Sequence, residues 1–163
     1  MENNFDINNL VRENVKEMKP YSSARDEFED FDTAKQRNVK TNQILLGNGR
    51  DEVLDLISRA FCEPKTDNVV TLPPTYGMYG VLANINAVEN KEVLLSQDFQ
   101  PQIEKIMEAV DSTTKIIFLC SPNNPTGNSF SDESVVNLLQ NFDGLVVIDE
   151  AYIDFSSKQS WIN

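Results

Sequence analysis

The chain has 163 residues, of which 40% are hydrophobic and 25% are charged, which is typical of a globular domain with its own core. Its net charge of -12 excludes a broadly basic surface, so we expect neither nucleic acid nor an anionic membrane as a partner. Histidine is absent, which excludes Ser-His and Cys-His nucleophile pairs and any histidine-bound metal. Cys62 and Cys120 lie in or beside apolar stretches, so we expect buried, reduced thiols and no metal site.

The N-terminal part of the sequence predicts an arm and a connector. Apolar residues between positions 5 and 18 fall mostly on one helical face, and Pro20 should end that helix. Residues 25–42 are densely charged and poorly patterned, which is typical of a connector. The first residues are polar and acidic, and no apolar run reaches the roughly 20 residues of a membrane span, so we expect a cytoplasmic location.

Strands and helices are predicted to alternate from Ile44 onward. A short apolar run at 44–46 ends in glycine and precedes an amphipathic helix. The expected core face of that helix consists of Val53, Leu56, Ile57, Ala60 and Phe61. A strand at 68–74 ends in two prolines, a helix at 75–87 has Thr75 as its cap, and a strand follows at 91–95.

The second half continues the same alternation. A helix is expected at 101–110, with proline at its first position and an apolar face of Ile103, Ile106, Met107 and Val110. Residues 114–120 form a continuous apolar strand, and Ser131 should cap a helix whose face is Val135, Leu138, Leu139 and Phe142. The last buried strand is "GLVVIDEAY". This order predicts an α/β fold with a mostly parallel sheet, in which ligands bind at the carboxyl ends of the strands.

Polar loops are predicted at those carboxyl ends. "GNGRDE" opens a helix, and its free N–H groups suit an anion, although a plain turn with Asp51 in the first helical turn fits equally well. Asp149 ends a buried strand and needs a partner, which a pyridinium N–H or a local backbone group could supply. Asn124 precedes a proline, which fixes the direction of its amide, and Tyr76 suits stacking on a flat ligand. A simple loop and ordinary core packing are the alternatives for these two residues.

The motifs together resemble a known family. "SPNNPTG" followed by "DEAY" resembles the signature of fold-type-I pyridoxal-phosphate aminotransferases. "KPYSSARDE", "LGNG" with "DE", "RAFCEP" and "PPTYGMY" are similar to histidinol-phosphate aminotransferases more narrowly. The resemblance implies that residues 43–163 are an incomplete large domain that binds pyridoxal 5'-phosphate, and that residues 1–42 form an arm and connector. It also implies a homodimer for the full-length family.

The resemblance also implies a role for each candidate residue. Asp149 should pair with the ring nitrogen of the cofactor, Asn124 and Tyr152 should bond the ring hydroxyl, and Tyr76 should stack on the ring. The backbone N–H groups of Arg50 and Asp51 should hold the phosphate. The implied reaction moves an amino group between glutamate and imidazole-acetol phosphate, a phosphorylated keto substrate, in histidine biosynthesis.

The sequence departs from this family in three places. No catalytic residue is assigned, because the Schiff-base lysine of the family lies farther along than Asn163, and Lys158 is too close to the strand to replace it. A segment resembling "L-ANENP…RYPD" is missing after "SSARDE", and Arg50 stands where relatives carry a small residue. We therefore expect the isolated chain to be inactive. A catalytically dead remnant that binds cofactor or phosphate, or another fold-type-I aminotransferase or decarboxylase, are the alternatives.

Overall fold

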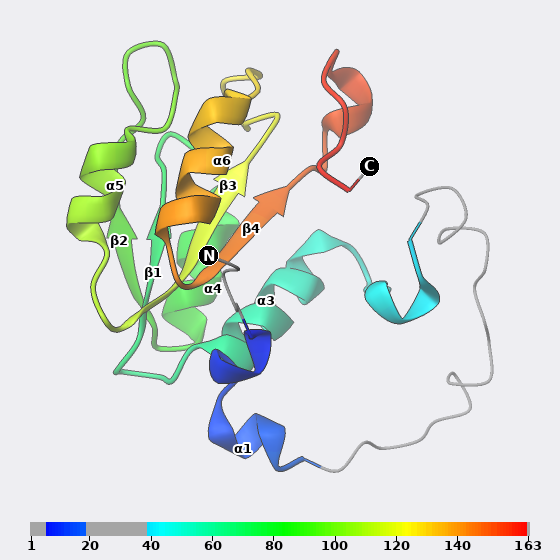
Figure 1. Cartoon of the computed structure of the whole chain (residues 1–163), viewed down its shortest axis with the longest axis vertical. Helices are drawn as coiled ribbons and strands as arrows, with labels where there is room; N and C mark the ends of the chain where they lie inside the picture. Colours follow the sequence, from blue (N-terminus) through cyan, green and yellow to red (C-terminus); the bar gives the residue numbers. More distant parts are fainter. Residues whose placement is uncertain (1–5, 19–38, 163) are drawn as a thin grey trace.

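A single parallel sheet forms the centre of the molecule. The computed structural model describes residues 6–18 and 39–162. Its four strands lie in the order β2-β1-β3-β4, and every pairing is parallel (Figure 1). They are β1 (Asn68–Thr71), β2 (Glu89–Glu92), β3 (Thr114–Cys120) and β4 (Leu145–Asp149). The predicted α/β fold with a mostly parallel sheet is confirmed.

Helices cover both faces of this sheet (Figure 1). They are α3 (Arg50–Phe61), α4 (Met78–Ile85), α5 (Ile103–Ala109) and α6 (Asp132–Asn141). One buried cluster joins α5 and α6 to the sheet, and a second joins α3 and α4 to it. Each apolar strand contributes side chains to both clusters, because successive side chains of a strand point to opposite faces of the sheet. In β3, Ile117 and Leu119 belong to the first cluster, whereas Ile116 and Phe118 belong to the second.

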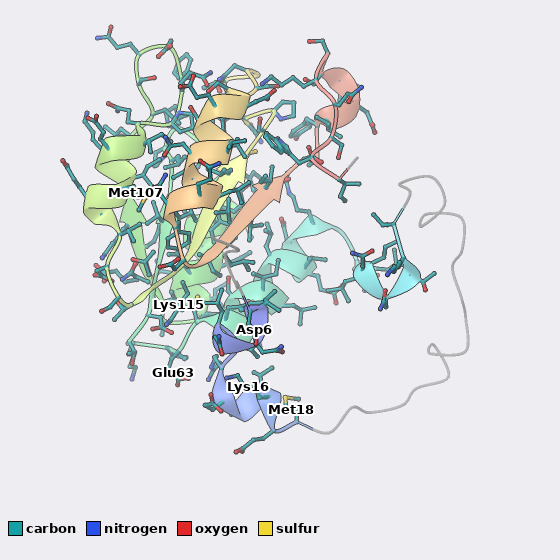
Figure 2. The ribbon with its side chains drawn as sticks, viewed as in Figure 1. Asp6, Lys16, Met18, Glu63, Met107 and Lys115 are labelled. Atoms are coloured by element: carbon teal, nitrogen blue, oxygen red, sulfur yellow. The ribbon has the colours of Figure 1, made fainter. Side chains whose placement is uncertain are left out.

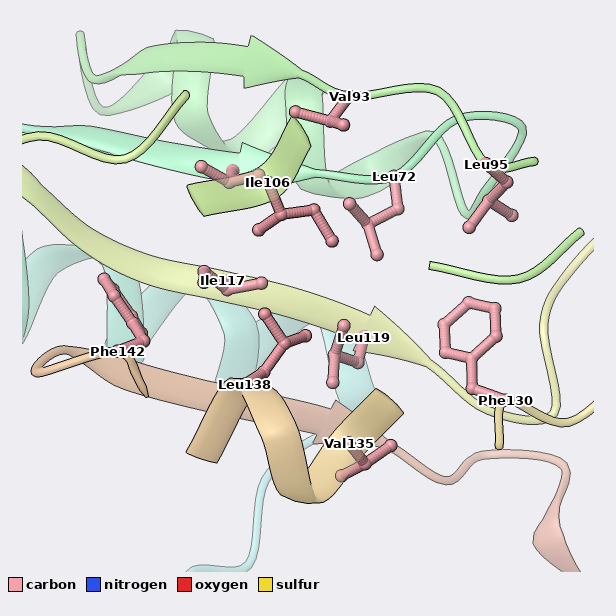
Figure 3. Packing of buried hydrophobic residues seen from close by; sticks show 11 residues of the cluster. Leu72, Val93, Leu95, Ile106, Ile117, Leu119, Phe130, Val135, Leu138 and Phe142 are labelled. Carbon is pink, nitrogen blue, oxygen red and sulfur yellow. The ribbon is translucent and has the colours of Figure 1, made fainter. Parts of the chain in front are cut away.

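The first cluster shows how the sequence pattern becomes packing. Figure 3 shows Ile106 of α5 and Leu138 of α6 directed toward Ile117 and Leu119 of β3. All four side chains are fully buried. The predicted core face of α5 is confirmed, since Ile103, Met107 and Val110 also pack against this cluster. Leu139, by contrast, is 47% exposed, so its predicted place on the core face of α6 is wrong.

The start of α6 agrees with prediction, whereas two other predicted helix starts are wrong. The Ser131 hydroxyl accepts a hydrogen bond from the Ser134 N–H (3.1 Å), as a cap should. Thr75 does not cap α4, which begins at Met78, because the Thr75 hydroxyl donates to Asn123 Oδ1 instead. The helix predicted from Pro101 begins two residues later, because Gln102 keeps a non-helical backbone (φ -94°, ψ 87°) as its N-cap.

The strand predicted at 91–95 is shifted toward the N-terminus. Regular pairing of β2 with β1 covers Glu89 to Glu92 and ends where β1 ends, at Thr71. Beyond that point Pro73 lacks an N–H group, so it contributes only its carbonyl oxygen, which accepts from the Leu95 N–H (2.8 Å). The chain remains hydrogen-bonded there without forming a regular ladder.

The region around Ile44–Leu46 is not a strand of the sheet, contrary to the prediction. The turn η3 (Thr41–Gln43) precedes it, and Leu45 and Leu46 are each 62% exposed. The predicted core face of α3 is confirmed in part, because Ile57 and Phe61 pack against the second cluster. Leu56 is 45% exposed, so its predicted place on that face is wrong, and Leu54 and Ser58 are buried instead.

The last strand is less buried than predicted. Residues Leu145 to Ile148 of β4 are half-buried, and only Asp149 is fully buried. β4 forms one edge of the sheet, where β3 is its only partner among the described residues. Its alternate side chains still pack on both clusters, so the strand contributes to the core on both faces of the sheet. It is followed by the turn η4 (Ile153–Phe155).

The N-terminal arm forms two short helices in place of the predicted continuous helix. They are η1 (Ile7–Asn9) and α1 (Glu13–Lys16). Arg12 interrupts them with an extended backbone, because its N–H donates to the Ala60 carbonyl (3.1 Å) and its guanidinium bonds the Arg59 carbonyl and Glu63. Figure 2 labels Asp6 and Lys16 of the arm together with Glu63 and Lys115. The arm therefore contacts the C-terminal end of α3, away from the carboxyl ends of the strands.

Cys62 and Cys120 are free and buried, as predicted. None of the helices in residues 6–18 and 39–162 is long and apolar enough to cross a membrane. Most of the predicted connector, and the "KPYSSARDE" motif, lie outside the described residues.

Candidate functional site

Hydrogen bonds hold three loops together at the carboxyl edge of the sheet. The Thr75 hydroxyl donates to Asn123 Oδ1 (2.9 Å), and the Asn123 amide donates to the Pro74 carbonyl (2.8 Å). The Ser121 N–H donates to the Asp149 carbonyl oxygen (3.0 Å). The loops after β1, β3 and β4 therefore form one surface. Asn123, which is 2% exposed, links two of these loops, and sequence reasoning missed it in favour of its neighbour Asn124.

Asp149 lies at the centre of this edge as a buried carboxylate. Its side chain is 3% exposed, and its Oδ2 accepts from the Tyr79 hydroxyl (2.6 Å) and faces Arg50 Nη1 at 3.2 Å. Its Oδ1 accepts from the Ala151 N–H (3.1 Å). The local backbone bond considered from the sequence is thus present, and it coexists with contacts to two distant side chains. The charge is compensated on every side, as burial requires.

Tyr79 is the residue of this group that sequence reasoning did not assign. It is 1% exposed, and its ring stacks on Phe118 with 4.9 Å between ring centroids and an interplanar angle of 6°. Burial raises the pKa of Tyr79 far above its ordinary value, so the hydroxyl keeps its proton and remains a donor to Asp149. The available signal was its position three residues after Tyr76, whose ring it meets edge to face with 5.6 Å between the ring centroids.

The start of α3 brings Arg50, Asp51 and Tyr76 to the same place. Gly49 precedes the helix with φ +85°, and no side chain caps the helix. The Arg50 guanidinium carbon lies 3.7 Å from the centroid of the Tyr76 ring. The Tyr76 hydroxyl donates to the Asp51 carboxylate at 3.1 and 3.2 Å.

The Arg50 guanidinium remains positively charged in this environment. Burial opposes the charge, but the hydrogen bond with Tyr76 and the negative charge of Asp149 raise the pKa of Arg50 above its ordinary value. The guanidinium is also 3.8 Å from Asp51 Oδ1, measured at Nε. Arg50, Asp51, Tyr76 and Asp149, all predicted from the sequence, are therefore brought together as one charged and aromatic group.

Asn124 and Tyr152 lie together in a neighbouring pocket of about 290 Å³. The pocket is lined by Pro122, Asn123, Asn124, Pro125, Gly127, Ser129, Tyr152, Phe155 and Ser156. Asn124 is half-buried, and Tyr152 is 41% exposed. The predicted residues therefore form two groups on the same edge, and the Ser121–Asp149 backbone bond joins the loops that carry them.

The groups at this edge of the sheet suit several kinds of ligand. The N-terminus of α3 favours an anion, because first-turn N–H groups and the helix dipole point outward there. Asp149 can accept a hydrogen bond from a protonated ring nitrogen, and Tyr76 offers an aromatic face. No group of three His, Cys, Asp or Glu side chains within the described residues is arranged to hold a metal ion.

Lys158 is engaged away from this group. Its ammonium donates to the Phe130 carbonyl (2.7 Å) and to Asp132 (2.6 Å), at the start of α6. It therefore stabilises the chain after β4 against α6. The exclusion of Lys158 as the lysine that the family resemblance implies stays a prediction.

Comparison with known proteins places these observations in a family. The model for "Aminotransferase class I and II" matches residues 22–163. The histidinol-phosphate aminotransferase of Flavobacterium johnsoniae is 67% identical over 192 aligned residues, which cover 98% of this chain and 55% of that protein. The one from Flavobacterium psychrophilum is 59% identical, with 99% of this chain and 56% of that protein covered. The chain thus spans about half the length of the curated relatives it matches.

The length of the alignment shows where the chain differs from its relatives. The F. johnsoniae alignment extends over 192 residues, whereas the chain has 163, so at least 29 aligned positions of the relative have no counterpart here. A missing internal segment was expected from the sequence. The alignment lengths agree with that expectation.

Solved structures of aminotransferases share the fold. The histidinol-phosphate aminotransferase from Clostridium acetobutylicum matches with a TM-score of 0.71 at 22% identity, covering 91% of this chain and 44% of that one. The aspartate aminotransferase from Thermotoga maritima matches with a TM-score of 0.71 at 22% identity, covering 80% and 37%. The family resemblance drawn from the motifs is confirmed, and the chain belongs to the aminotransferase class I and II family.

Proposed function

We propose that this chain provides the cofactor-binding part of a histidinol-phosphate aminotransferase, which transfers an amino group between glutamate and imidazole-acetol phosphate in histidine biosynthesis. The names and high identities of the Flavobacterium relatives support the substrate class. The observation that carries the proposal is the buried Asp149 carboxylate beside the Tyr76 ring and the start of α3.

The side chains on this edge fit pyridoxal 5'-phosphate. The chain offers a buried carboxylate for a protonated ring nitrogen, an aromatic face, and an uncapped N-terminus of a 12-residue helix for a phosphate. Asn124 and Tyr152 line one pocket and are both able to bond a ring hydroxyl. Each part of the cofactor therefore has a chemically matched group on this edge.

Each residue then has a defined task. Asp149 keeps a ring nitrogen protonated, and Tyr79 fixes the carboxylate by donating to Oδ2 at 2.6 Å. Tyr76 holds the ring flat, and the backbone N–H groups of Arg50 and Asp51 bind the phosphate. When bound, pyridoxal phosphate supplies the electron sink that amino transfer requires.

The further assignments extend to domains, location and assembly. We assign residues 43–163 to the cofactor-binding large domain and residues 1–42 to an arm and connector. We also propose a cytoplasmic enzyme that works as a homodimer when it has the length of its relatives. We expect a polypeptide of these 163 residues alone not to transfer amino groups, since no lysine has been assigned to the site.

A pair of chimeras tests the proposed reaction. In the first, the chain is joined to the F. johnsoniae sequence that lies beyond it, and the missing internal segment is also restored. The matched control receives the downstream sequence alone. We expect the first chimera to transfer amino groups from glutamate to imidazole-acetol phosphate, and the control to be much less active. A first chimera that prefers a keto acid without phosphate would contradict the proposed substrate, and turnover by the 163-residue chain would contradict its expected inactivity.

A further inference from the structure

The Arg50 side chain makes the two contacts that a protonated aromatic ring would make at this site. Its guanidinium lies 3.7 Å from the centroid of the Tyr76 ring, and its Nη1 lies 3.2 Å from Asp149 Oδ2. A guanidinium is planar, carries a delocalised positive charge and presents N–H donors at its edge. A pyridinium ring shares these three properties, so the same tyrosine and carboxylate suit both groups.

We propose that the Arg50 guanidinium holds the ring position of this site and competes with the protonated ring of pyridoxal phosphate for Tyr76 and Asp149. The inference rests on the proposed function, because it concerns the same cofactor position. Arg50 is then a binding residue that lowers ring affinity. A ring can enter only when the arginine side chain has moved away.

Electrostatics makes the two occupants mutually exclusive. Asp149 is a single carboxylate, and two of its contacts, with the Tyr79 hydroxyl and the Ala151 N–H, come from groups that the fold holds in place. Placing a second cation beside Arg50 would add repulsion between like charges at a half-buried position. One positive group at a time therefore occupies the space between Asp149 and Tyr76.

The structure also offers the displaced arginine a second partner. Arg50 Nε is 3.8 Å from Asp51 Oδ1, and the Asp51 side chain is 46% exposed. A rotation of the arginine toward Asp51 would keep its charge paired and bring it to the start of α3, where a phosphate would bind. Arg50 would then weaken ring binding without preventing phosphate binding.

A ligand titration separates the competing role from a supporting one. The probe is pyridoxine 5'-phosphate, which has no aldehyde and cannot react with surface lysines, and its fluorescence is followed as the chain is added. We expect Arg50→Ala to bind the probe about tenfold more tightly than the unmodified chain, which corresponds to about 1.4 kcal/mol. Arg59→Ala is the matched control, because Arg59 lies on the same helix, carries the same charge and is 58% exposed in its ion pair with Asp55.

The outcomes distinguish this inference from the proposed function. Equal or weaker binding by Arg50→Ala would overturn the competition, while binding by both proteins would leave the cofactor proposal standing. Absence of binding to the unmodified chain and to both variants would overturn the cofactor proposal and the competition together. Tighter binding by Arg59→Ala to the same degree would show a general charge effect and would also overturn the competition.

A second measurement tests the position of the arginine without any ligand. Thermal unfolding is compared for the unmodified chain, Arg50→Ala, Asp149→Asn and the double variant. If Arg50 is held by Asp149, the shifts in melting temperature will not be additive, because either single change already breaks the contact. Additive shifts would overturn the inference, since the guanidinium would then not be held at the ring position.

Discussion

The hydrogen bond from Tyr79 to Asp149 should contribute measurably to the stability of the chain. The bond is 2.6 Å long, and both side chains are buried. Tyr79→Phe removes the hydroxyl and keeps the ring, so the stack on Phe118 is retained. The substitution therefore removes the donor to the buried carboxylate, together with the contact of the same hydroxyl with the Cys120 thiol.

The expected loss follows from the remaining partners of Asp149. A hydrogen bond to a charged group contributes about 1.5–3 kcal/mol, and a buried acceptor that loses its partner costs a similar amount. Asp149 retains Arg50 at 3.2 Å and the Ala151 N–H at 3.1 Å, so its charge stays compensated. We therefore expect the free energy of unfolding to fall by about 2 kcal/mol, toward the lower part of that range.

Chemical unfolding of Tyr79→Phe and Tyr76→Phe provides the measurement and its control. Tyr76 also donates to a carboxylate, but its partner Asp51 is 46% exposed, so solvent can replace the hydroxyl. We expect a loss of about 0.5 kcal/mol for Tyr76→Phe. Equal losses for the two variants would refute the reasoning, because a buried carboxylate would then lose no more stability with its donor than an exposed one.

Two further predictions concern the core and one helix start. Burial raises the pKa of Cys62 to about 12 from an ordinary value of 9.0, so above pH 9 the unfolded state loses a proton that the folded state keeps. The contribution of Cys62 to the free energy of unfolding should then fall by about 1.4 kcal/mol per pH unit, up to the pKa of the folded state. When the free energy of unfolding is measured against pH, Cys62→Ala should therefore show a flatter alkaline slope than the unmodified chain. Parallel slopes for the two proteins would contradict this. Ser131→Ala should lower the free energy of unfolding in urea by about 1 kcal/mol through loss of the cap on α6; an unchanged value would show that the helix start is held by other contacts.

Local sequence patterns, which depend only on residues close together in the chain, predicted the fold best. The continuous apolar run of β3 and the Ser131 cap of α6 were predicted with the observed bounds, because both depend on neighbours in the chain. The order of strands and helices followed from the same local patterns. A parallel sheet then places the loops after β1, β3 and β4 on one edge, which is why Asp149 and Tyr76 were predicted as part of one site.

The wrong predictions have a common physical cause in contacts between distant segments. Thr75 is a good capping residue, yet its hydroxyl bonds Asn123, which lies 48 positions away. Arg12 lies in a helical pattern, yet its backbone N–H bonds Ala60 on α3. Such a contact gives a polar group a distant partner in place of its local one, and the local sequence pattern does not show which distant partners are present.

The contacts of Arg50 with Tyr76 and Asp149 are a further case of contacts between distant segments, and they bear on ligand binding at the site. From the sequence Arg50 was a side chain standing where relatives of the family carry a small residue, whereas the structure places it on Tyr76 and against Asp149. The charges of this edge are therefore already compensated by groups of the chain itself. A ligand that binds here must exchange one set of contacts for another, so its affinity measures the difference between two occupants of the site and not the sum of its own contacts.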